Sequence, residues 1–591
     1  MHLPVKLKTL LIYILWALLD GFILASAITL YAADRGGSNI FYIQSVPELS
    51  MLLLIISAIV LTAAFFALFC LRKRLYRYIT PLCVLIFAVT ANLASSTARP
   101  YFALVMSGIA AAAMFVIKEK FPDRLPKLLK GKGLYAAVLI LTVLVTLQVA
   151  VAAIARHRAY SSSTFDLGIF AQMYHFMATD FTQNTTVERN ILLSHFAVHF
   201  SPIYYLLLPF YMIFPSVEFL LTAQAAVCFS GVIPLLLLCR RWRYSESVTL
   251  GVCAVFLLYP AFTCGLFYDF HENAFLVPLL MWALYFIQKD NTLGISISAL
   301  LILCVKEDAG LYVIFLGLYA LFSKKNSKLC AIMLLSTGVL GFIAVTSLVE
   351  VIGEGIKVSR YSIYLNSGQD SLTDVVMNVI KNPAFFFSKL LSEKKLLFLV
   401  QMLAPLLFLS VRTRKPADWT LIAPLVLVNL APDYVYQSDI NYQYIFGSGV
   451  LLVFLFAKNI RYSKEKTKAA AAAAMAGAII LTGTATAKYE YVEKFSDNAE
   501  DIAATDRTLA EIPRDAVIFT TTYFTPHLAD CEKLYMYPFV YDADTEIVPD
   551  YVVLDNRSGV VREYDELAKH WLKMGYTVVS EEGYATVFKK Q

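Results

Sequence analysis

The sequence is poor in charged residues. Asp, Glu, Lys and Arg make up only 16% of its 591 residues, whereas hydrophobic residues make up 59%. Soluble domains have roughly 25% charged residues. Because the apolar residues also come in long blocks, a soluble protein is excluded, and we expect an integral membrane protein.

Two kinds of chemistry lack their usual sequence signals. No glycine-rich loop of the Walker or Rossmann type follows a strand-like segment, which disfavours an ATP-driven pump and a cytosolic nucleotide-sugar enzyme. The nine cysteines are scattered and mostly lie in apolar blocks, so neither a disulfide framework nor a metal-ligand spacing emerges. The net charge of +6 comes from short clusters, which is not the pattern of a nucleic-acid-binding protein.

The apolar blocks predict an all-α polytopic membrane protein with about 13–15 spans. Six blocks reach the roughly 20 residues that a helix needs to cross the hydrocarbon core. They lie near 8–32, 49–71, 134–155, 217–239, 329–350 and 469–487. Shorter runs also predicted to span lie near 79–95, 101–117, 247–265, 274–288, 293–305, 310–322, 396–411, 418–431 and 444–457. The first block is interpreted as a retained span, because it is longer than a signal-peptide core.

Clusters of Lys and Arg predict the orientation, because such clusters stay on the cytoplasmic side of a membrane. They are Arg72–Arg77, Lys118–Lys132, Arg240–Arg243, Lys324–Lys328, Arg412–Lys415 and Lys458–Lys468. Placing all of them inside predicts a cytoplasmic N-terminus, outer loops at 156–216 and 351–395, and an extracytoplasmic C-terminal part. The stretch 200–214 would break this alternation if it crossed, so we expect a re-entrant or interfacial element there.

Three parts of the chain are expected: an N-terminal transmembrane module at 1–133, a transmembrane core at 134–487 and a soluble domain at 488–591. The last part is long enough to form its own core. We predict a small α/β domain with helices at 501–512 and 563–574, strands at 516–522 and 551–555, and a strand pair at 576–589. His527 and Asp555 are expected on its solvated surface.

Four stretches with ionisable residues fall at the predicted outer boundary of the membrane. They are Thr164–Phe170 with Asp166, Ser194–Pro202 with His195 and His199, Tyr268–Glu272 with Asp269 and His271, and Lys306–Asp308. Ionisable residues beside apolar spans are costly and usually face a protein interior or an aqueous cavity. Any one of them could be an ordinary loop charge, but the convergence of four predicts a common cavity.

Asp166 is the candidate general base. A carboxylate beside an acceptor hydroxyl can take its proton as the oxygen attacks an anomeric carbon, while cations stabilise a departing phosphate. Asp166 starts a stretch to Phe176 that suits a helix on the membrane surface, so an N-cap is its alternative role, and the two can coexist. Lys306 is the first candidate for the phosphate contact. Arg360 in the 351–395 loop is the second, with an ordinary surface or snorkelling role as its alternative.

His195 and His199 are four residues apart and would share a helical face. They could hold a divalent metal with Asp269 or His271, but this spacing without a third fixed ligand is a weak signal, and no metal site is assigned. His199 and His271 could instead donate hydrogen bonds to the substrate or have structural roles. The tyrosine-rich stretch 432–444 suits interfacial anchoring, with sugar stacking as the alternative.

The motifs FDLGIF, HFSP, DFHE and KED, in this order and each followed by an apolar span, resemble a bacterial and archaeal family of predicted membrane proteins of unassigned function. That family looks related to the GT-C class of glycosyltransferases. The resemblance covers roughly 150–560. GT-C enzymes use polyprenyl-phosphate sugars, and those similar to the aminoarabinose and protein O-mannosyl transferases carry an acidic catalytic residue in their first large outer loop. The resemblance therefore implies a GT-C-like core with Asp166 as base.

The sequence departs from the better-known GT-C enzymes in two ways. About four spans precede the acidic loop, so residues 1–133 look like an added module. Many of those enzymes also have a second acidic residue close to the first, and none adjoins Asp166. Asp269, Glu272, Glu307 or Asp308 could fill that place from other loops.

We therefore predict a membrane glycosyltransferase that transfers a sugar from a polyprenyl-phosphate donor to an extracytoplasmic glycan, lipid or protein of the cell envelope. The candidate catalytic residues are Asp166, Asp269 and Glu307, and the candidate substrate-binding residues are His195, His199, His271, Glu272, Lys306, Asp308 and Arg360. No cofactor is firmly implied, and the expected partners are the lipid bilayer, the donor and the acceptor. The alternatives are a lipid or small-solute transporter or flippase that uses the same cavity, and a non-catalytic relative. The lack of an obvious internal repeat favours the enzyme over the transporter.

Overall fold

The computed structural model describes residues 5–33, 50–72, 75–94, 98–117, 121, 126–162, 165–323, 328–353, 358–536, 547–560 and 564–591. Several residues of the predicted motifs and basic clusters lie outside this description: Lys73, Arg74, Lys118, Lys120, Arg124, Thr164, Lys324 and Lys325. Glu563, the predicted start of a helix, also lies outside it.

Each predicted apolar block contains a helix, although in the blocks near 396–411 and 418–431 the α-helix covers only part of the block. The long ones form α1 (Val5–Ala32), α2 (Met51–Leu71), α5 (Lys132–Arg158), α8 (Val217–Ser230) with α9 (Val232–Arg241), α15 (Lys328–Ile352) and α21 (Lys466–Asp497). The shorter ones form α3 (Tyr76–Leu93), α4 (Pro100–Val116), α10 (Glu246–Leu257), α11 (Pro260–Leu266), α12 (Leu276–Lys289), α13 (Thr292–Leu303), α14 (Gly310–Phe322), α18 (Glu393–Leu403), α19 (Pro416–Thr420) and α20 (Phe446–Asn459). Among the described residues, nine helical segments are long and apolar enough to cross a membrane. The chain is therefore a polytopic helical membrane protein, as predicted.

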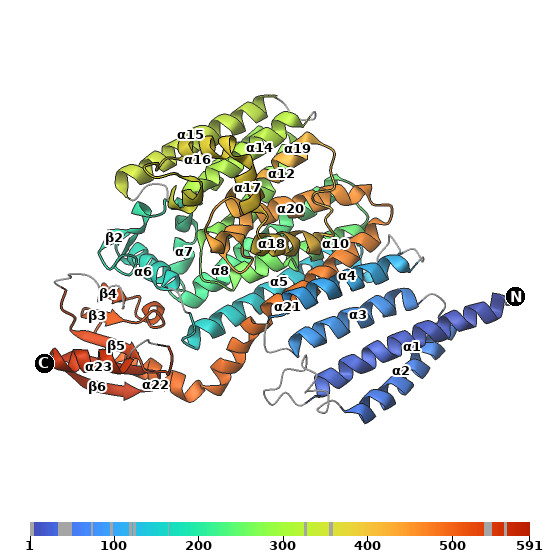
Figure 1. The fold of residues 1–591 in the computed structure, drawn as a ribbon, viewed down its shortest axis with the longest axis horizontal. Coiled ribbons are helices and arrows are strands. Elements are labelled where there is room, and N and C mark those ends of the chain that lie inside the picture. Colours follow the sequence, from blue (N-terminus) through green and yellow to red (C-terminus); the bar gives the residue numbers. More distant parts are fainter. Residues whose placement is uncertain are drawn as a thin grey trace.

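The N-terminal helices form one edge of the molecule (Figure 1). Helix α1 packs against α2 and α3, and α3 and α4 pack against α21. The side chain of Asn92 in α3 donates a hydrogen bond to the backbone oxygen of Ile479 in α21 at 3.0 Å. Helix α21 thus joins the N-terminal module to the core.

Residues of the basic clusters contact neighbouring elements at one end of the bundle. The Arg240 guanidinium lies 5.7 Å from the centre of the Tyr135 ring, near the start of α5. Lys468 at the start of α21 donates a hydrogen bond to the backbone oxygen of Ile117, just after α4, at 2.8 Å. Helix α5 runs from this end to Arg158, so the segment that follows it lies at the opposite end. This agrees with the separation of basic clusters and outer loops that the sequence predicts.

The loop after α5 does not contain another span. The stretch 200–214 forms only a 3₁₀ helix, η4 (Pro202–Leu206), and the four-residue helix α7 (Leu208–Tyr211). Both are far shorter than the roughly 20 residues that a crossing helix needs. The predicted non-crossing element is therefore confirmed.

Helix α6 (Asp166–Thr179) is buried along most of its length. The prediction that it lies on the membrane surface is wrong, because the C-terminal domain covers it. A Cβ atom added at Gly168 would lie 2.3 Å from Oγ1 of Thr525. Figure 1 shows α6 between the helical core and the C-terminal sheet.

Two short helices and a 3₁₀ helix fill the 351–395 loop. They are η7 (Val358–Tyr364), α16 (Leu372–Lys381) and α17 (Pro383–Leu390). The Asn382 side chain and Pro383 start α17 directly after α16 ends.

The C-terminal part is an α/β domain, as predicted. It contains α22 (Ala499–Ala510), α23 (Tyr564–Lys573) and a sheet in the order β4-β3-β5-β7-β6, in which β3 is parallel to β4 and β5. The strands are β3 (Val517–Thr520), β4 (Lys533–Met536), β5 (Tyr551–Asp555), β6 (Tyr576–Glu582) and β7 (Ala585–Lys590). Strand β4 was not predicted. Asp555, expected at the surface, is buried and forms an ion pair with Arg557.

Side chains of the loop between α6 and η4 form hydrogen bonds to the backbone of the C-terminal domain. In this loop, β1 (Asn184–Thr185) pairs with β2 (Leu193–Ser194). Thr186 donates a hydrogen bond to the oxygen of Leu534 at 2.6 Å. The Asn190 side chain bonds both the nitrogen and the oxygen of Met536, at 2.8 and 2.9 Å. The domain thereby fixes the segment that carries Glu188.

Candidate functional site

A cavity of about 160 Å³ lies where α6, the loop after it and several later segments meet. Seven of the sequence-predicted site residues line it: Asp166, His195, His199, His271, Glu272, Lys306 and Arg360. They come from five segments that are far apart in the sequence. The predicted convergence of charged stretches into one cavity therefore holds for most of the candidates.

Asp166 is the first residue of α6, and its side chain makes no capping hydrogen bond. The N-cap alternative is therefore wrong. Its carboxylate Oδ2 accepts a hydrogen bond from Tyr268 Oη at 2.9 Å and lies 3.4 Å from His271 Nε2. Burial raises the pKa of Asp166, but His271 and Tyr268 lower it by more, so the pKa ends below its ordinary value. The carboxylate is ionised at neutral pH, as a general base requires.

His271 connects Asp166 to the backbone of its own loop. Its Nδ1 lies 3.3 Å from the backbone oxygen of Asp269. Its Nε2 lies on the side of the Asp166 carboxylate, where a hydrogen bond donated by Nε2 favours the ionised carboxylate.

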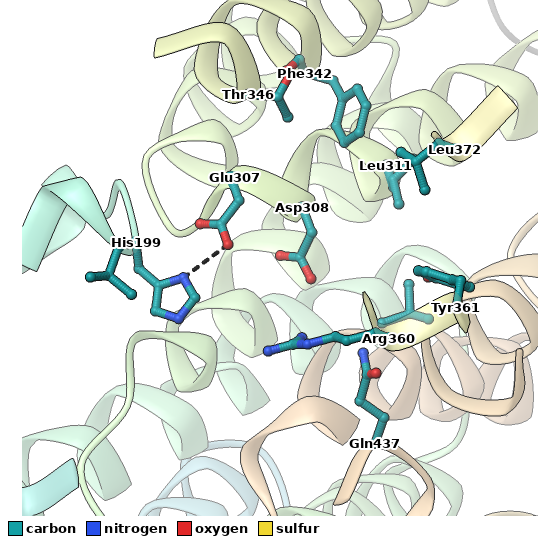
Figure 2. Close-up of a pocket in the computed structure, with 12 residues that line it drawn as sticks. His199, Glu307, Asp308, Leu311, Phe342, Thr346, Arg360, Tyr361, Leu372 and Gln437 are labelled. Carbon is teal, nitrogen blue, oxygen red and sulfur yellow. Dashed lines mark hydrogen bonds and ion pairs between the residues drawn. The ribbon is translucent and has the colours of Figure 1, made fainter. Parts of the chain in front are cut away.

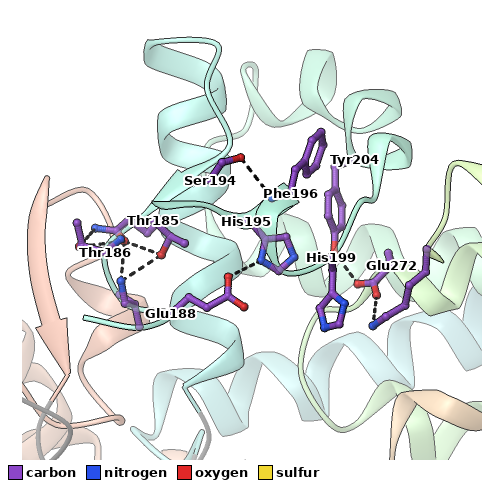
Figure 3. Close-up of polar contacts among 12 residues, drawn as sticks. Thr185, Thr186, Glu188, Ser194, His195, Phe196, His199, Tyr204 and Glu272 are labelled. Carbon is purple, nitrogen blue, oxygen red and sulfur yellow. Dashed lines mark hydrogen bonds and ion pairs between the residues drawn. The ribbon is translucent and has the colours of Figure 1, made fainter. Parts of the chain in front are cut away.

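Lys306 and Glu272 form a buried ion pair. Lys306 Nζ lies 2.8 Å from Glu272 Oε1, and both side chains are at most 5% exposed. Glu272 Oε2 also accepts a hydrogen bond from Tyr204 Oη at 2.5 Å (Figure 3). The charge of Lys306 is therefore balanced inside the protein, which weakens its candidacy as the phosphate contact.

Arg360 is a better-placed cation than Lys306. Its guanidinium lies 5.1 Å from the ring centre of Tyr434 and 5.3 Å from that of Tyr444. It forms no ion pair with any carboxylate in the described ranges. Because Arg can bind a phosphate with two parallel hydrogen bonds, Arg360 is the stronger of the two candidates for a phosphate contact.

A second cavity of about 110 Å³ adjoins the first and shares His199 and Arg360 with it. Figure 2 shows the Arg360 side chain extending into the space below Asp308. Glu307 and Asp308 line this second cavity rather than the first, and Glu307 Oε1 lies 2.9 Å from His199 Nδ1. Its other wall is apolar, formed by Leu311, Phe342, Leu372 and Val428.

Five buried polar atoms around these two cavities have no hydrogen-bond partner among the described residues. They are Nε2 of His195, Oε1 of Gln443, Oε2 of Glu307, Oδ1 of Asp308 and Oε1 of Gln437. Buried polar atoms in proteins are nearly always hydrogen-bonded, so each such exception needs a reason. Their grouping around the two cavities is the pattern expected for the binding of a polar ligand.

His195 and Glu188 form a second buried pair. His195 Nδ1 lies 2.7 Å from Glu188 Oε2 (Figure 3). Burial opposes both charges, but the attraction between the two groups raises the pKa of His195 and lowers that of Glu188. Glu188 lines the same cavity as Asp166 and lies between α6 and β2. It was not predicted from the sequence, although it is an acidic residue only seven positions before His195.

Asp269 does not line either cavity. Its Oδ1 accepts a hydrogen bond from Arg156 Nη1 at 2.8 Å, and both side chains are buried. Arg156 also donates to the backbone oxygen of Tyr268 at 2.5 Å. Asp269 thus fixes the loop that carries Tyr268 and His271 to α5, and its geometry does not support the predicted catalytic role.

The two histidines that could have shared a metal lie close together, with ring centres 5.9 Å apart, but each faces a different carboxylate. His195 Nδ1 faces Glu188, whereas His199 Nδ1 faces Glu307. Within the described ranges, no group of three or more His, Cys, Asp or Glu side chains could hold a metal ion.

The fold and the cavity together define a polytopic helical membrane protein with an acidic and histidine-containing site at one end of its bundle. Residues 156–584 match the family described as predicted membrane protein (DUF2079), and the chain belongs to this family. The predicted family resemblance is thereby confirmed, and residues 1–155 lie outside the match.

One solved structure similar to this chain is the apo crystal structure of ArnT from Cupriavidus metallidurans. The sequence identity is 14% and the TM-score is 0.36, over 76% of this chain and 97% of that chain. A comparison with curated proteins finds no match.

Proposed function

We propose that this protein is a membrane glycosyltransferase that moves a sugar from a polyprenyl-phosphate donor to an acceptor hydroxyl. The observation that carries the proposal is that an ionised carboxylate, Asp166, and a cation without a carboxylate partner, Arg360, line one cavity. Acid–base catalysis of sugar transfer needs a base for the acceptor and a positive charge for the departing phosphate. The motifs resemble a family that looks related to GT-C enzymes, which supports the same assignment.

In this mechanism the acceptor oxygen attacks the anomeric carbon of the donor sugar. Its proton passes to Asp166, the new glycosidic bond forms, and the bond between the anomeric carbon and the phosphate oxygen breaks. Arg360 stabilises the negative charge on the polyprenyl phosphate that leaves. Before transfer, hydrogen bonds from Tyr268 and His271 hold Asp166 in its ionised form.

The second cavity suits the part of the donor where phosphate meets lipid. Arg360 and His199 lie on its boundary with the first cavity, whereas Leu311, Phe342 and Leu372 offer an apolar surface. A polyprenyl chain is apolar and its phosphate is anionic, so both halves of the junction would meet groups of matching chemistry.

The experiment that tests this function is sugar transfer from a panel of radiolabelled polyprenyl-phosphate sugars, in membranes that contain native acceptors. Asp166→Asn is expected to lower transfer by about 10²- to 10⁴-fold with donor binding retained. Asp180→Asn, an exposed carboxylate at the other end of α6, is the matched control and should transfer normally. Unimpaired transfer by Asp166→Asn would remove it from the base role. If the wild type transfers no sugar from any donor, the flippase alternative gains weight.

We further propose that the protein lies in the cell membrane with its N-terminus in the cytoplasm and its C-terminal domain outside. The segregation of basic residues to one end of the bundle supports this orientation. Asp565→Cys introduces a thiol at an exposed position in α23. A membrane-impermeant maleimide should label this variant in intact cells; labelling only after the cells are opened would reverse the orientation.

A further inference from the structure

A third cavity, of about 620 Å³, lies beside the Asp166 cavity. It is formed mainly by α18 and by the tyrosine-rich segment 432–442, and Tyr434 lines both cavities. Its volume is within the roughly 300–1,000 Å³ typical of sites for small ligands. Ser392, Lys394, Asp433 and Tyr436 on its wall are exposed, so it is open to solvent.

A chain of tyrosine contacts leads from this third cavity to the candidate base. The Tyr434 and Tyr436 ring centres are 5.0 Å apart, and those of Tyr436 and Tyr442 are 4.6 Å apart. The Tyr442 ring centre lies 4.8 Å from that of Tyr268, whose hydroxyl bonds Asp166. A ligand lying along these rings would have one end next to Asp166.

The tyrosine-rich segment is held in place by a buried lysine. Lys395 Nζ donates hydrogen bonds to the backbone oxygens of Leu430 and Pro432, at 2.6 and 3.1 Å. These bonds fix the backbone at the start of the segment. Side chains of the following residues line the cavity. The segment is therefore a fixed wall of the cavity.

The wall of this cavity combines aromatic faces with polar groups of both charges. Besides three tyrosines and the lysines Lys394 and Lys395, it contains Gln401, Asp433, Ser438, Asp439 and Asn441. Sugars present C–H groups that pack on aromatic faces and hydroxyls that bond amides and carboxylates. By contrast, the second cavity has an apolar wall that suits a lipid. The second and third cavities, which both adjoin the Asp166 cavity, thus suit different kinds of ligand.

We infer that the third cavity binds the acceptor, and that the acceptor is a saccharide chain whose terminal hydroxyl reaches Asp166. This inference rests on the proposed glycosyltransferase function and adds the chemical class of the acceptor. It also gives the N-terminal module a role, because Pro100 at the start of α4 forms part of the wall. The backbone nitrogen of Arg99 donates a hydrogen bond to the oxygen of Gly483 at 2.9 Å, which fixes that part of the wall to α21.

The test is binding of a panel of oligosaccharides to the full-length protein in nanodiscs, measured by saturation-transfer NMR. The panel contains β-1,4-linked glucose, α-1,4-linked glucose and β-1,4-linked N-acetylglucosamine oligomers. Tyr436→Ala is expected to weaken binding by about tenfold, because an aromatic contact of this size is lost. Tyr462→Ala is the matched control, since Tyr462 is 51% exposed, lies beyond the far end of α20 and lines none of the three cavities.

The outcomes separate this inference from the proposed function. Oligosaccharide binding that is unchanged in Tyr436→Ala, or no binding by any member of the panel, overturns the saccharide site, even if Asp166-dependent transfer is found. Binding that depends on Tyr436 in a protein that transfers no sugar would keep the saccharide site and overturn the glycosyltransferase. Where transfer is found, Tyr436→Ala should raise the KM for the acceptor about tenfold and leave the KM for the donor unchanged.

Discussion

Tyr268 donates a hydrogen bond from its hydroxyl to Oδ2 of Asp166 at 2.9 Å. This bond favours the ionised carboxylate and lowers its pKa. Tyr268→Phe should therefore raise the pKa of Asp166, and the acid limb of the pH–rate profile of transfer should move up by about one pH unit. Tyr205→Phe, which removes a partly exposed hydroxyl outside the site, should leave the profile unchanged. An unshifted acid limb in Tyr268→Phe would mean that Asp166 does not set the pH dependence.

Arg360 should determine donor affinity. The Arg360 guanidinium forms no ion pair among the described residues, and its charge favours the ionised form of the neighbouring Asp308. Arg360→Met is expected to weaken donor binding by about 10- to 100-fold, with Arg360→Lys in between, because Lys keeps the charge but loses the two-pronged geometry. The measurement is equilibrium binding of a labelled polyprenyl-phosphate sugar. Arg507→Met, an exposed change in α22, should bind normally. Equal donor affinity in Arg360→Met and wild type would place the phosphate elsewhere.

Lys306 should behave differently from Arg360, because it forms a buried ion pair with Glu272. Lys306→Met leaves the Glu272 charge uncompensated and should destabilise the protein by about 3–5 kcal/mol. The double variant Lys306→Met/Glu272→Gln should recover part of this loss. Thermal unfolding in detergent micelles measures both effects. If Lys306→Met keeps wild-type stability and instead loses donor binding, Lys306 is the phosphate contact that the sequence suggested.

The sequence predicted the helices and the assembly of the site better than it predicted individual pairings. Long apolar blocks identify spans because a helix that crosses the hydrocarbon core must be apolar over about 20 residues, whichever helices it packs against. The motif residues converge because charges beside spans need a polar interior. By contrast, the pairing of Asp269 with Arg156 depends on how α5 packs against a loop more than 100 residues later, and no local pattern encodes that contact. Strand β4 is only four residues long and has no periodicity that could be recognised.

The His195–Glu188 pair predicts a pH dependence of stability. The raised pKa of His195 contributes stability that is complete below its ordinary value of 6.5 and is lost as pH rises through the folded-state value. The lowered pKa of Glu188 contributes stability that is present above 4.5 and is lost as pH falls through its folded-state value. The Tm difference between wild type and Glu188→Gln should therefore be largest between about pH 4.5 and pH 6.5, where both contributions are present, and should shrink toward alkaline pH. A difference that stays constant from acidic to alkaline pH would contradict an ionised pair.

The contact between Gly168 and Thr525 predicts that the C-terminal domain positions the candidate base. A Cβ atom at Gly168 would lie 2.3 Å from Oγ1 and 2.7 Å from Cβ of Thr525, so Gly168→Ala must push α6 away from the domain. Such overpacking typically costs about 1–3 kcal/mol.

Asp166 begins the same helix two residues earlier, so transfer should fall in Gly168→Ala, and hydrogen–deuterium exchange should rise in α6 and around Thr525. Gly108→Ala, where an added Cβ meets nothing within 4 Å, is the matched control and should change neither quantity. Thr525→Gly removes both clashing atoms, so the double variant Gly168→Ala/Thr525→Gly should regain transfer. If transfer stays low in the double variant while exchange returns to normal, the close approach at Gly168 serves some purpose other than the docking of this domain.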